Sequence, residues 1–171
     1  MRKLITFGLC LVGCAAAQTK VSGVGKCSAK PEVQQSVEVG DRAGHMLVLV
    51  KQSCDWTTPM EIEGLKGKSY AAVITSDVSG TKSTDRGYVV LTMDNGDKAF
   101  VRINTGMGTM GKDGPESGEG TWSFTGGTGK LRGLTGKGTY KSKTTAGVGE
   151  DTVEGEYSIV APAAKSAPKK K

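Results

Sequence analysis

The sequence has few of the residues on which most catalytic and metal sites depend. It contains one histidine, His45, and only four cysteines in 171 residues. A zinc site needs several Cys or His ligands at set spacings, and a Ser-His-Asp triad would have to use His45, which stands alone at the start of an expected strand. The sequence therefore predicts no metal and no cofactor. It shows no catalytic constellation, so catalytic residues are unknown and a non-enzymatic protein is favoured.

Long apolar runs are also missing. Residues 4–13 form the clearest one, and it is about half the length that a membrane-spanning helix needs. Arg2 and Lys3 precede this run and the small residues 15–17 follow it, which is the three-part pattern of a cleaved export signal. We expect residues 1–17 to be a signal peptide, with the mature protein exported to the periplasm or the cell exterior.

Two processing routes fit this leader. Residues 11–14, ending in Cys14, resemble the bacterial lipobox, in which cleavage before the cysteine is coupled to attachment of a lipid. The alanines at 15 and 17 equally suit the ordinary signal peptidase, which would leave Gln18 first. A lipid anchor on Cys14 and an unmodified N-terminus both stay open.

Positive charge is concentrated at the two ends of the chain. The whole sequence has 23 basic and 17 acidic residues, a net charge of +6. Without Arg2, Lys3 and the four lysines of residues 161–171, 17 basic residues balance the 17 acidic ones. The 161–171 tail is composed mainly of Ala, Pro and Lys and is predicted to be disordered. The neutral domain between these ends is not expected to bind nucleic acid.

Residues 18–160 are expected to form one small domain with a single disulfide. Cys27 and Cys54 are its only cysteines. An exported protein meets an oxidising compartment, which favours their pairing.

The alternation of apolar and polar residues predicts antiparallel strands. Residues 152–160 and 121–125 alternate with period two, and no segment shows the pattern of an amphipathic helix of three turns. Among the 26 glycines, many are expected at bulges, tight turns and corners. The predicted fold is all-β, a single small antiparallel barrel of about eight strands. Strands are expected at residues 46–51, 70–76, 87–93, 98–104, 121–125, 139–143 and 152–160, with a further short one at 60–64.

A hairpin is predicted at residues 87–104. Asn95 and Gly96 lie between its two strands, and Asn-Gly favours a two-residue type I′ turn. Pairing across that turn leaves two apolar faces, of which the second exceeds what the exterior of a monomer needs and suggests a homo-oligomer. The first face has Tyr88, Val90, Ala99, Val101 and Ile103, and the second has Val89, Leu91, Met93 and Phe100.

Other motifs carry less weight. Residues 106–111 match G-x-G-x-x-G, but no helix can begin after them, so a dinucleotide site is not predicted. His45 is interpreted as a residue at a solvent edge or turn. Trp56 and Trp122 are interpreted as core aromatics, either of which could line the mouth of a barrel.

One segment resembles a known group of barrels. Residues 126–140 read GGTGKLRGLTGKGTY and follow the WSFT of 122–125. They resemble the G-G-T-G segment of the allene oxide cyclase and dirigent barrels and of related exported bacterial proteins. The resemblance implies an eight-stranded calycin-like antiparallel barrel with an apolar cavity, often assembled as a trimer. Catalytic residues of the plant enzymes have no matching positions here. The segment is expected to form a strand-to-strand corner built on Gly126, Gly127, Gly129, Gly133 and Gly136.

Three functions follow from these observations. The first is a non-enzymatic envelope or secreted β-barrel that binds a small apolar ligand or serves as a structural accessory of the envelope. The second is a cyclase-like or dirigent-like catalyst that acts by confining a reactive intermediate in the barrel. The third is a homo-oligomeric scaffold.

Overall fold

A computed structural model of the protein describes residues 18–28, 30–111 and 114–160. Each strand begins or ends near a turn or a glycine. Within these ranges the elements are β1 (Thr19–Cys27), β2 (Val33–Glu38), β3 (His45–Thr58), β4 (Glu61–Ile62), β5 (Leu65–Ser79), β6 (Lys82–Met93), β7 (Lys98–Gly111), β8 (Gly114–Gly127), the 3-10 helix η1 (Gly129–Leu131), β9 (Leu134–Thr145) and β10 (Val148–Ile159).

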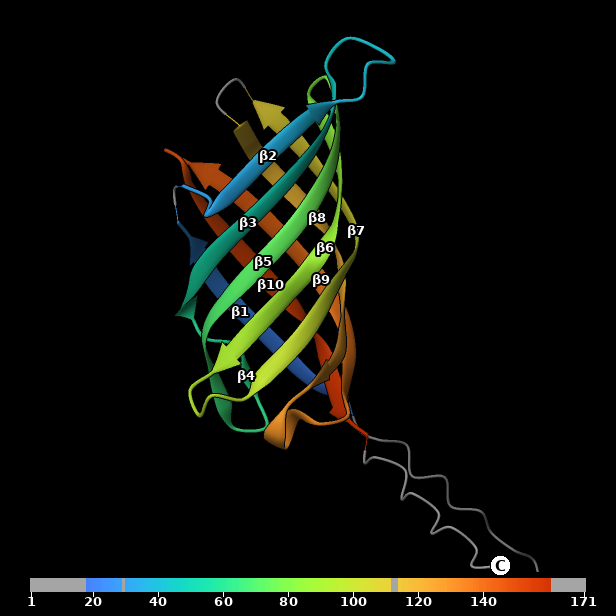
Figure 1. Ribbon diagram of the computed structural model, residues 1–171. Helices are drawn as coiled ribbons and strands as arrows, with labels where there is room; N and C mark the ends of the chain where they lie inside the picture. Colours follow the sequence, from blue (N-terminus) through green and yellow to red (C-terminus); the bar gives the residue numbers. More distant parts are fainter. Residues whose placement is uncertain (1–17, 29, 112–113, 161–171) are drawn as a thin grey trace, which may run out of the picture.

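Eight of these strands close into a barrel (Figure 1). Neighbouring strands are antiparallel in the order β3-β1-β10-β9-β8-β7-β6-β5, and β5 pairs again with β3 to complete the ring. β2 continues along the edge of β3 beyond β1, and β4 adds two residues beside β5. The predicted all-β barrel is confirmed.

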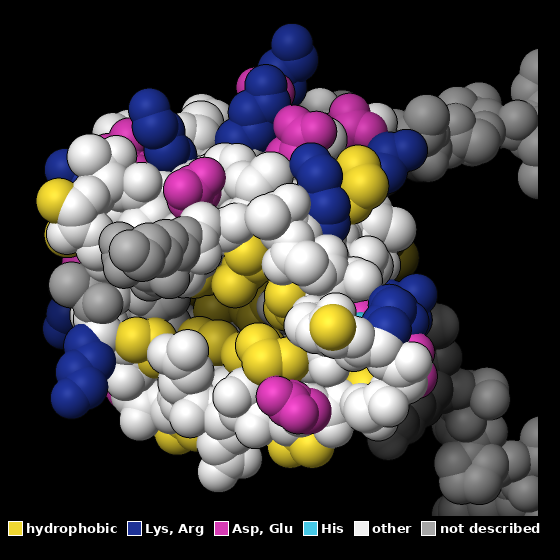
Figure 2. Space-filling view, turned by 90° about the horizontal axis from the view of Figure 1, so that it is seen from above, with side chains coloured by type: hydrophobic (Ala, Val, Ile, Leu, Met, Phe, Trp, Pro, Cys, Tyr) yellow, Lys and Arg dark blue, Asp and Glu magenta, His cyan; other side chains and the backbone are white. Residues whose placement is uncertain are grey.

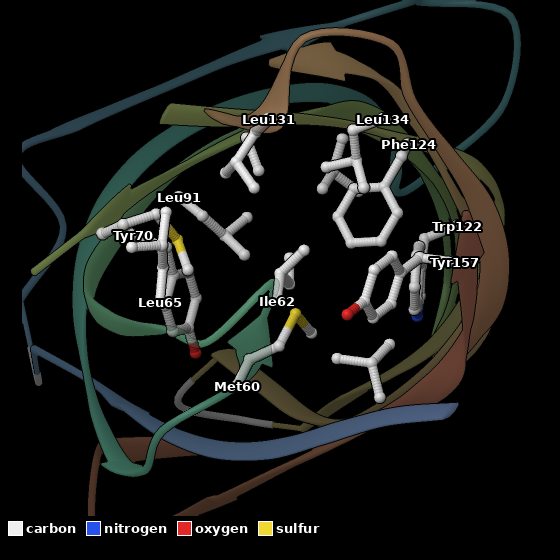
Figure 3. Packing of buried hydrophobic residues seen from close by; sticks show 14 of the residues in the cluster. Met60, Ile62, Leu65, Tyr70, Leu91, Trp122, Phe124, Leu131, Leu134 and Tyr157 are labelled. Carbon is white, nitrogen blue, oxygen red and sulfur yellow. The ribbon is translucent and has the colours of Figure 1, made fainter. Parts of the chain in front are cut away.

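One end of the barrel, here called the closed end, is filled by side chains. Ile62 enters from β4, and Leu131 and Leu134 enter from the corner that contains η1. Ile62 and Leu131 are 0% exposed and Leu134 is 1% exposed. Figure 3 shows Ile62 in the middle of the surrounding ring of side chains. Burial of each such side chain contributes about 1.5–3 kcal/mol, so this end provides the main hydrophobic core.

Glycines opposite an aromatic ring let the ring lie flat against the inner wall. Trp122 on β8 pairs with Gly138 on β9, which pairs with Gly155 on β10. A Cβ on Gly155 would come within 2.7 Å of Cζ2 of Trp122. The indole Nε1 then donates to the carbonyl of Thr139 at 3.0 Å. These strand glycines are therefore not bulges or corners but spaces for a ring.

The hairpin between β6 and β7 has a longer loop than the type I′ turn that the sequence predicts. The N–H of Met93 donates to the carbonyl of Asp97 at 2.8 Å, so three residues form the loop. Of these, Gly96 has a positive φ of 88° and Asn95 does not. A type I′ turn needs positive φ at two positions, whereas a three-residue loop needs one. The prediction of the turn type was wrong.

This extra loop residue exchanges the faces predicted for β6. A shift of one residue in register moves every side chain of a strand to the other face. Val89, Leu91 and Met93 therefore point into the barrel, where Leu91 is 3% and Met93 1% exposed. Tyr88 and Phe100 lie outside, 61% and 36% exposed. The apolar outer face that suggested a homo-oligomer interface is thus largely the barrel interior.

β1 and β2 were not among the expected strands. In β1 the inward positions are Val21, Gly23, Gly25 and Cys27, so the apolar alternation is broken by two glycines. A Cβ on Gly23 would come within 3.1 Å of Cε3 of Trp56. The Trp56 ring fills the space that an inward side chain of β1 would occupy. The sequence of β1 therefore lacks the regular alternation of apolar and polar residues from which a strand is predicted.

Cys27 and Cys54 form the predicted disulfide. The two cysteines are directly paired between β1 and β3, at the point where β2 takes over from β1. Among the described residues, no helix has the length and apolar character to cross a membrane. The predicted leader with Cys14 and the predicted tail lie outside the described residues.

Candidate functional site

The end of the barrel opposite the core, here called the open end, is hollow. Tyr70 points into the core, so Ile74, four residues further along β5, points the same way, as does its β3 partner Val50. Yet Val48, Val50, Ile74 and Val89 are only partly buried although they face inward. Solvent therefore reaches the inner wall. Figure 2 looks into this end and shows hydrophobic side chains lining a depression.

A tyrosine lies along the wall of this depression, held in place by two glycines. Tyr140 on β9 pairs with Gly120 on β8, which pairs with Gly106 on β7. A Cβ on Gly120 would come within 2.8 Å of Cε1 of Tyr140, and one on Gly106 would collide with the hydroxyl. Gly106 pairs in turn with Asp85 on β6, so the hydroxyl lies beside this aspartate. We call the inner surface formed by Val48, Val50, Ile74, Asp85, Val89 and Tyr140 the hollow.

The polar groups of the hollow are incompletely paired. Ser83 donates its hydroxyl to Oδ2 of Asp85 at 3.2 Å. The other oxygen, Oδ1, is buried and accepts no hydrogen bond from any described residue. Within the described ranges the Tyr140 hydroxyl has no hydrogen-bond partner either. A buried acceptor without a donor costs about 1–3 kcal/mol, so a ligand that supplied a donor would relieve this cost.

Burial and nearby acids keep Tyr140 protonated. Burial raises the pKa of Tyr140 to about 12, with smaller contributions from the charges of Asp85 and Asp151. The side chain is therefore a neutral phenol at physiological pH, able to donate a hydrogen bond and to present an aromatic face.

A second tyrosine and aspartate form a pair between the hollow and the core. The hydroxyl of Tyr70 donates to Oδ2 of Asp151 at 2.8 Å. The ring of Tyr70 lies over Gly25, where a Cβ would come within 2.6 Å of Cε1. Burial raises the pKa of Asp151 and the hydrogen bond from Tyr70 partly opposes this. Burial, with the charge of Asp151, also raises the pKa of Tyr70.

The disulfide packs against this pair without forming a metal site. Sγ of Cys27 lies 3.5 Å from Oδ2 of Asp151, but a disulfide sulfur has no proton to donate, so this is a packing contact. Ligand atoms of Cys27, Cys54 and Asp151 lie within 4.8 Å of one another. Metal binding by cysteine requires a thiolate, which the disulfide removes.

His45 lies at the end of a turn, where its N–H donates to the carbonyl of Arg42 at 3.3 Å, which is one of the two expected placements; its side chain is buried rather than at a solvent edge. Its Nε2 lies 2.9 Å from Oδ1 of Asp77, and its Nδ1 contacts Oδ1 of Asp41. The hydrogen bond with Asp41, supported by that with Asp77 and opposed by burial, raises the pKa of His45. With Arg42 donating to Ser79 at 3.2 Å, the histidine ties the loop before β3 to β5, a structural role.

The predicted corner glycines lie at the closed end, away from the hollow. Gly129 and Gly133 have φ of 52° and 79°, values that residues with a Cβ rarely adopt. The N–H of Val160 donates to the carbonyl of Gly133 at 2.9 Å, which fixes the end of β10 to the corner. Of the others, Gly126 and Gly136 also have positive φ, and Gly127 packs against Leu131.

The sequence did not single out the residues of the hollow, although a signal exists. Tyr140, a residue of the hollow, follows Gly138 on the inward face of β9. Asp151, between the hollow and the core, lies likewise on the inward face of β10 that includes Val153 and Tyr157. Polar residues in the inward phase of a strand are the feature that could have found them. Trp122 packs in the core and Trp56 packs against it, which confirms their interpretation as core aromatics.

Solved structures similar to this chain include two barrel proteins. The pterocarpan synthase dirigent protein GePTS1 is 14% identical, with a TM-score of 0.49 over 90% of this chain and 91% of that one. Pyocyanin demethylase is 12% identical, with a TM-score of 0.40 over 81% of this chain and 99% of that one. A dirigent protein, the kind of barrel that residues 126–140 resemble, is thus among them. No protein-family model and no curated protein matches the sequence.

Proposed function

We propose that the protein binds a small, largely apolar ligand in the hollow, without chemical conversion. The observation that supports this most is the partial exposure of Val48, Val50, Ile74 and Val89 on the inner wall. Inward apolar side chains left accessible to water lose the free energy of burial, which a ligand would restore. The disulfide of Cys27 and Cys54 supports a site of action in an oxidising compartment, as expected of an exported protein.

A neutral fluorescent probe, N-phenyl-1-naphthylamine, tests this proposal. The probe brightens on entering an apolar site, and we expect saturable binding by the unmodified protein. Val48→Trp would place a large ring in the hollow and weaken binding at least about tenfold, because a blocked site loses most of the apolar contact area. Leu47→Trp is the matched control, since Leu47 is the neighbouring residue on the outer face of β3 and is 53% exposed.

The two variants separate the possible outcomes. Loss of binding in Val48→Trp alone supports the hollow as the site. Equal binding by both variants, or no saturable binding by the unmodified protein, would overturn the proposal. Unfolding curves of the two variants show whether either has lost its fold.

A second candidate function is catalysis by confinement. The observation that favours it is that Tyr140 and Asp85 bring a neutral hydroxyl and an acidic side chain to the wall of an apolar site. Orientation of a reactive intermediate between such groups can direct its collapse to one product. Recovery of a bound compound unchanged after prolonged incubation would favour binding, and a rearranged product would favour catalysis.

A further inference from the structure

We propose that the ligand of the hollow carries a cationic nitrogen, an ammonium group on an apolar body, which Asp85 and Tyr140 receive. This inference rests on the proposed function and adds the chemical class of the ligand. It is carried by the charges that face the hollow and by the unpaired groups on its wall.

The first observation is the sign of the charge. Tyr140 and Asp85 lie on the inner wall in one row across four strands. The basic residues next to that row, Lys141 and Arg86, occupy outward positions and are exposed. Among the described residues that face the hollow, the charged side chains are acidic. Low-dielectric walls focus the field of such charges, so a cation is attracted and an anion is repelled.

The second observation is the unpaired acceptor. Oδ2 of Asp85 is paired with Ser83, whereas Oδ1 accepts no hydrogen bond from any residue in the described ranges. An ammonium group brings three donors and no acceptor, so it matches an acid that lacks donors.

The third observation is the aromatic ring beside the acid. Tyr140 lies flat along Gly120 and Gly106, with its hydroxyl next to Asp85. A cation within about 6 Å of a ring face is stabilised by the ring quadrupole. The apolar wall, including Val48 and Ile74, then contacts the uncharged part of the ligand. The hollow therefore offers separate places for the two parts of an amphiphilic amine.

Three compounds with one apolar body test the charge preference. 1-Naphthylmethylamine, 1-naphthylmethanol and 1-naphthoate would each compete at pH 7 against bound N-phenyl-1-naphthylamine. We expect the amine to displace the probe at least about tenfold more effectively than the alcohol, the size of one charge-assisted hydrogen bond, and the carboxylate to be weakest. Asp85→Asn should bring the amine close to the alcohol. Asp55→Asn, on an exposed position of β3, should leave the order unchanged.

The outcomes distinguish this inference from the proposed function. If the probe does not bind at all, the proposed function fails. If the probe binds but the amine and the alcohol compete equally, or the carboxylate competes best, ligand binding stands and the cationic class is overturned. If Asp85→Asn does not fold, the comparison of the three compounds on the unmodified protein still decides.

Discussion

A single methyl group on Gly25 should disturb the pair of Tyr70 and Asp151. In Gly25→Ala the new Cβ would lie 2.6 Å from Cε1 and 2.8 Å from Cζ of Tyr70, a side chain that is 7% exposed. Overpacking of a core costs about 1–3 kcal/mol. Displacing the hydroxyl also removes the donor to Asp151, worth about 1–3 kcal/mol. The lower entropy of the unfolded alanine chain offsets about 0.4–1 kcal/mol, which leaves a net loss of about 3 kcal/mol.

Urea and thermal unfolding would measure this loss. For a domain of this size about 3 kcal/mol lowers Tm by roughly 6–12 °C. Gly149→Ala is the matched control, because Gly149 also lies in a barrel strand and a Cβ there meets its nearest atom, Cβ of Cys27, at 3.6 Å. Its stability should change by less than about 1 kcal/mol. Equal stability of the two variants would refute the idea that strand glycines here make space for aromatic rings.

Two further predictions concern the disulfide and the histidine. Removing the disulfide with Cys27→Ala and Cys54→Ala, whose separation is 27 residues, should cost about 3.5 kcal/mol by the loop-entropy relation. Urea unfolding would show it, and reduction of the unmodified protein should give a similar loss. The raised pKa of His45 means that its stabilising effect is complete below its unfolded pKa of about 6.5 and is lost as pH rises through the higher folded value. Unfolding free energies across that range should fall with pH, and His45→Gln should flatten the profile; an unchanged slope in this variant contradicts the assignment.

The fold class could be predicted because most strands show their pattern locally. Residues 152–160 and 121–125 alternate with period two, and the structure places 152–159 in β10 and 121–125 in β8. The glycines of the 126–136 segment mark a corner by their backbone requirements, and four of the five have positive φ. The disulfide between Cys27 and Cys54 could be predicted because these are the only two cysteines of the expected domain and because an oxidising compartment was expected.

The register of β6 against β7 and the residues of the hollow could not be predicted, because both depend on how the strands pair rather than on local sequence. The turn at Asn95 and Gly96 is compatible with loops of two or three residues, and this one-residue difference decides which face of β6 is buried. β1 was missed because Gly23 and Gly25 occupy its inward positions. The rings that fill those positions come from Trp56 and Tyr70 on other strands. These contacts between a glycine on one strand and a ring on another form only when the strands pair, so the local sequence of β1 does not indicate them.

The pairing of β1 with β10 has a consequence for how the protein is made. Thr19 pairs with Tyr157, and Cys27 with Gly149, so the seam of the barrel joins strands from opposite ends of the described chain. Contacts this distant in sequence form slowly, because much of the chain must be ordered before they can. During synthesis, the ring stays open until β10 has left the ribosome, and β1 and β9 present free strand edges until then. A chaperone that shields those edges would prevent them from pairing with other chains until the barrel closes.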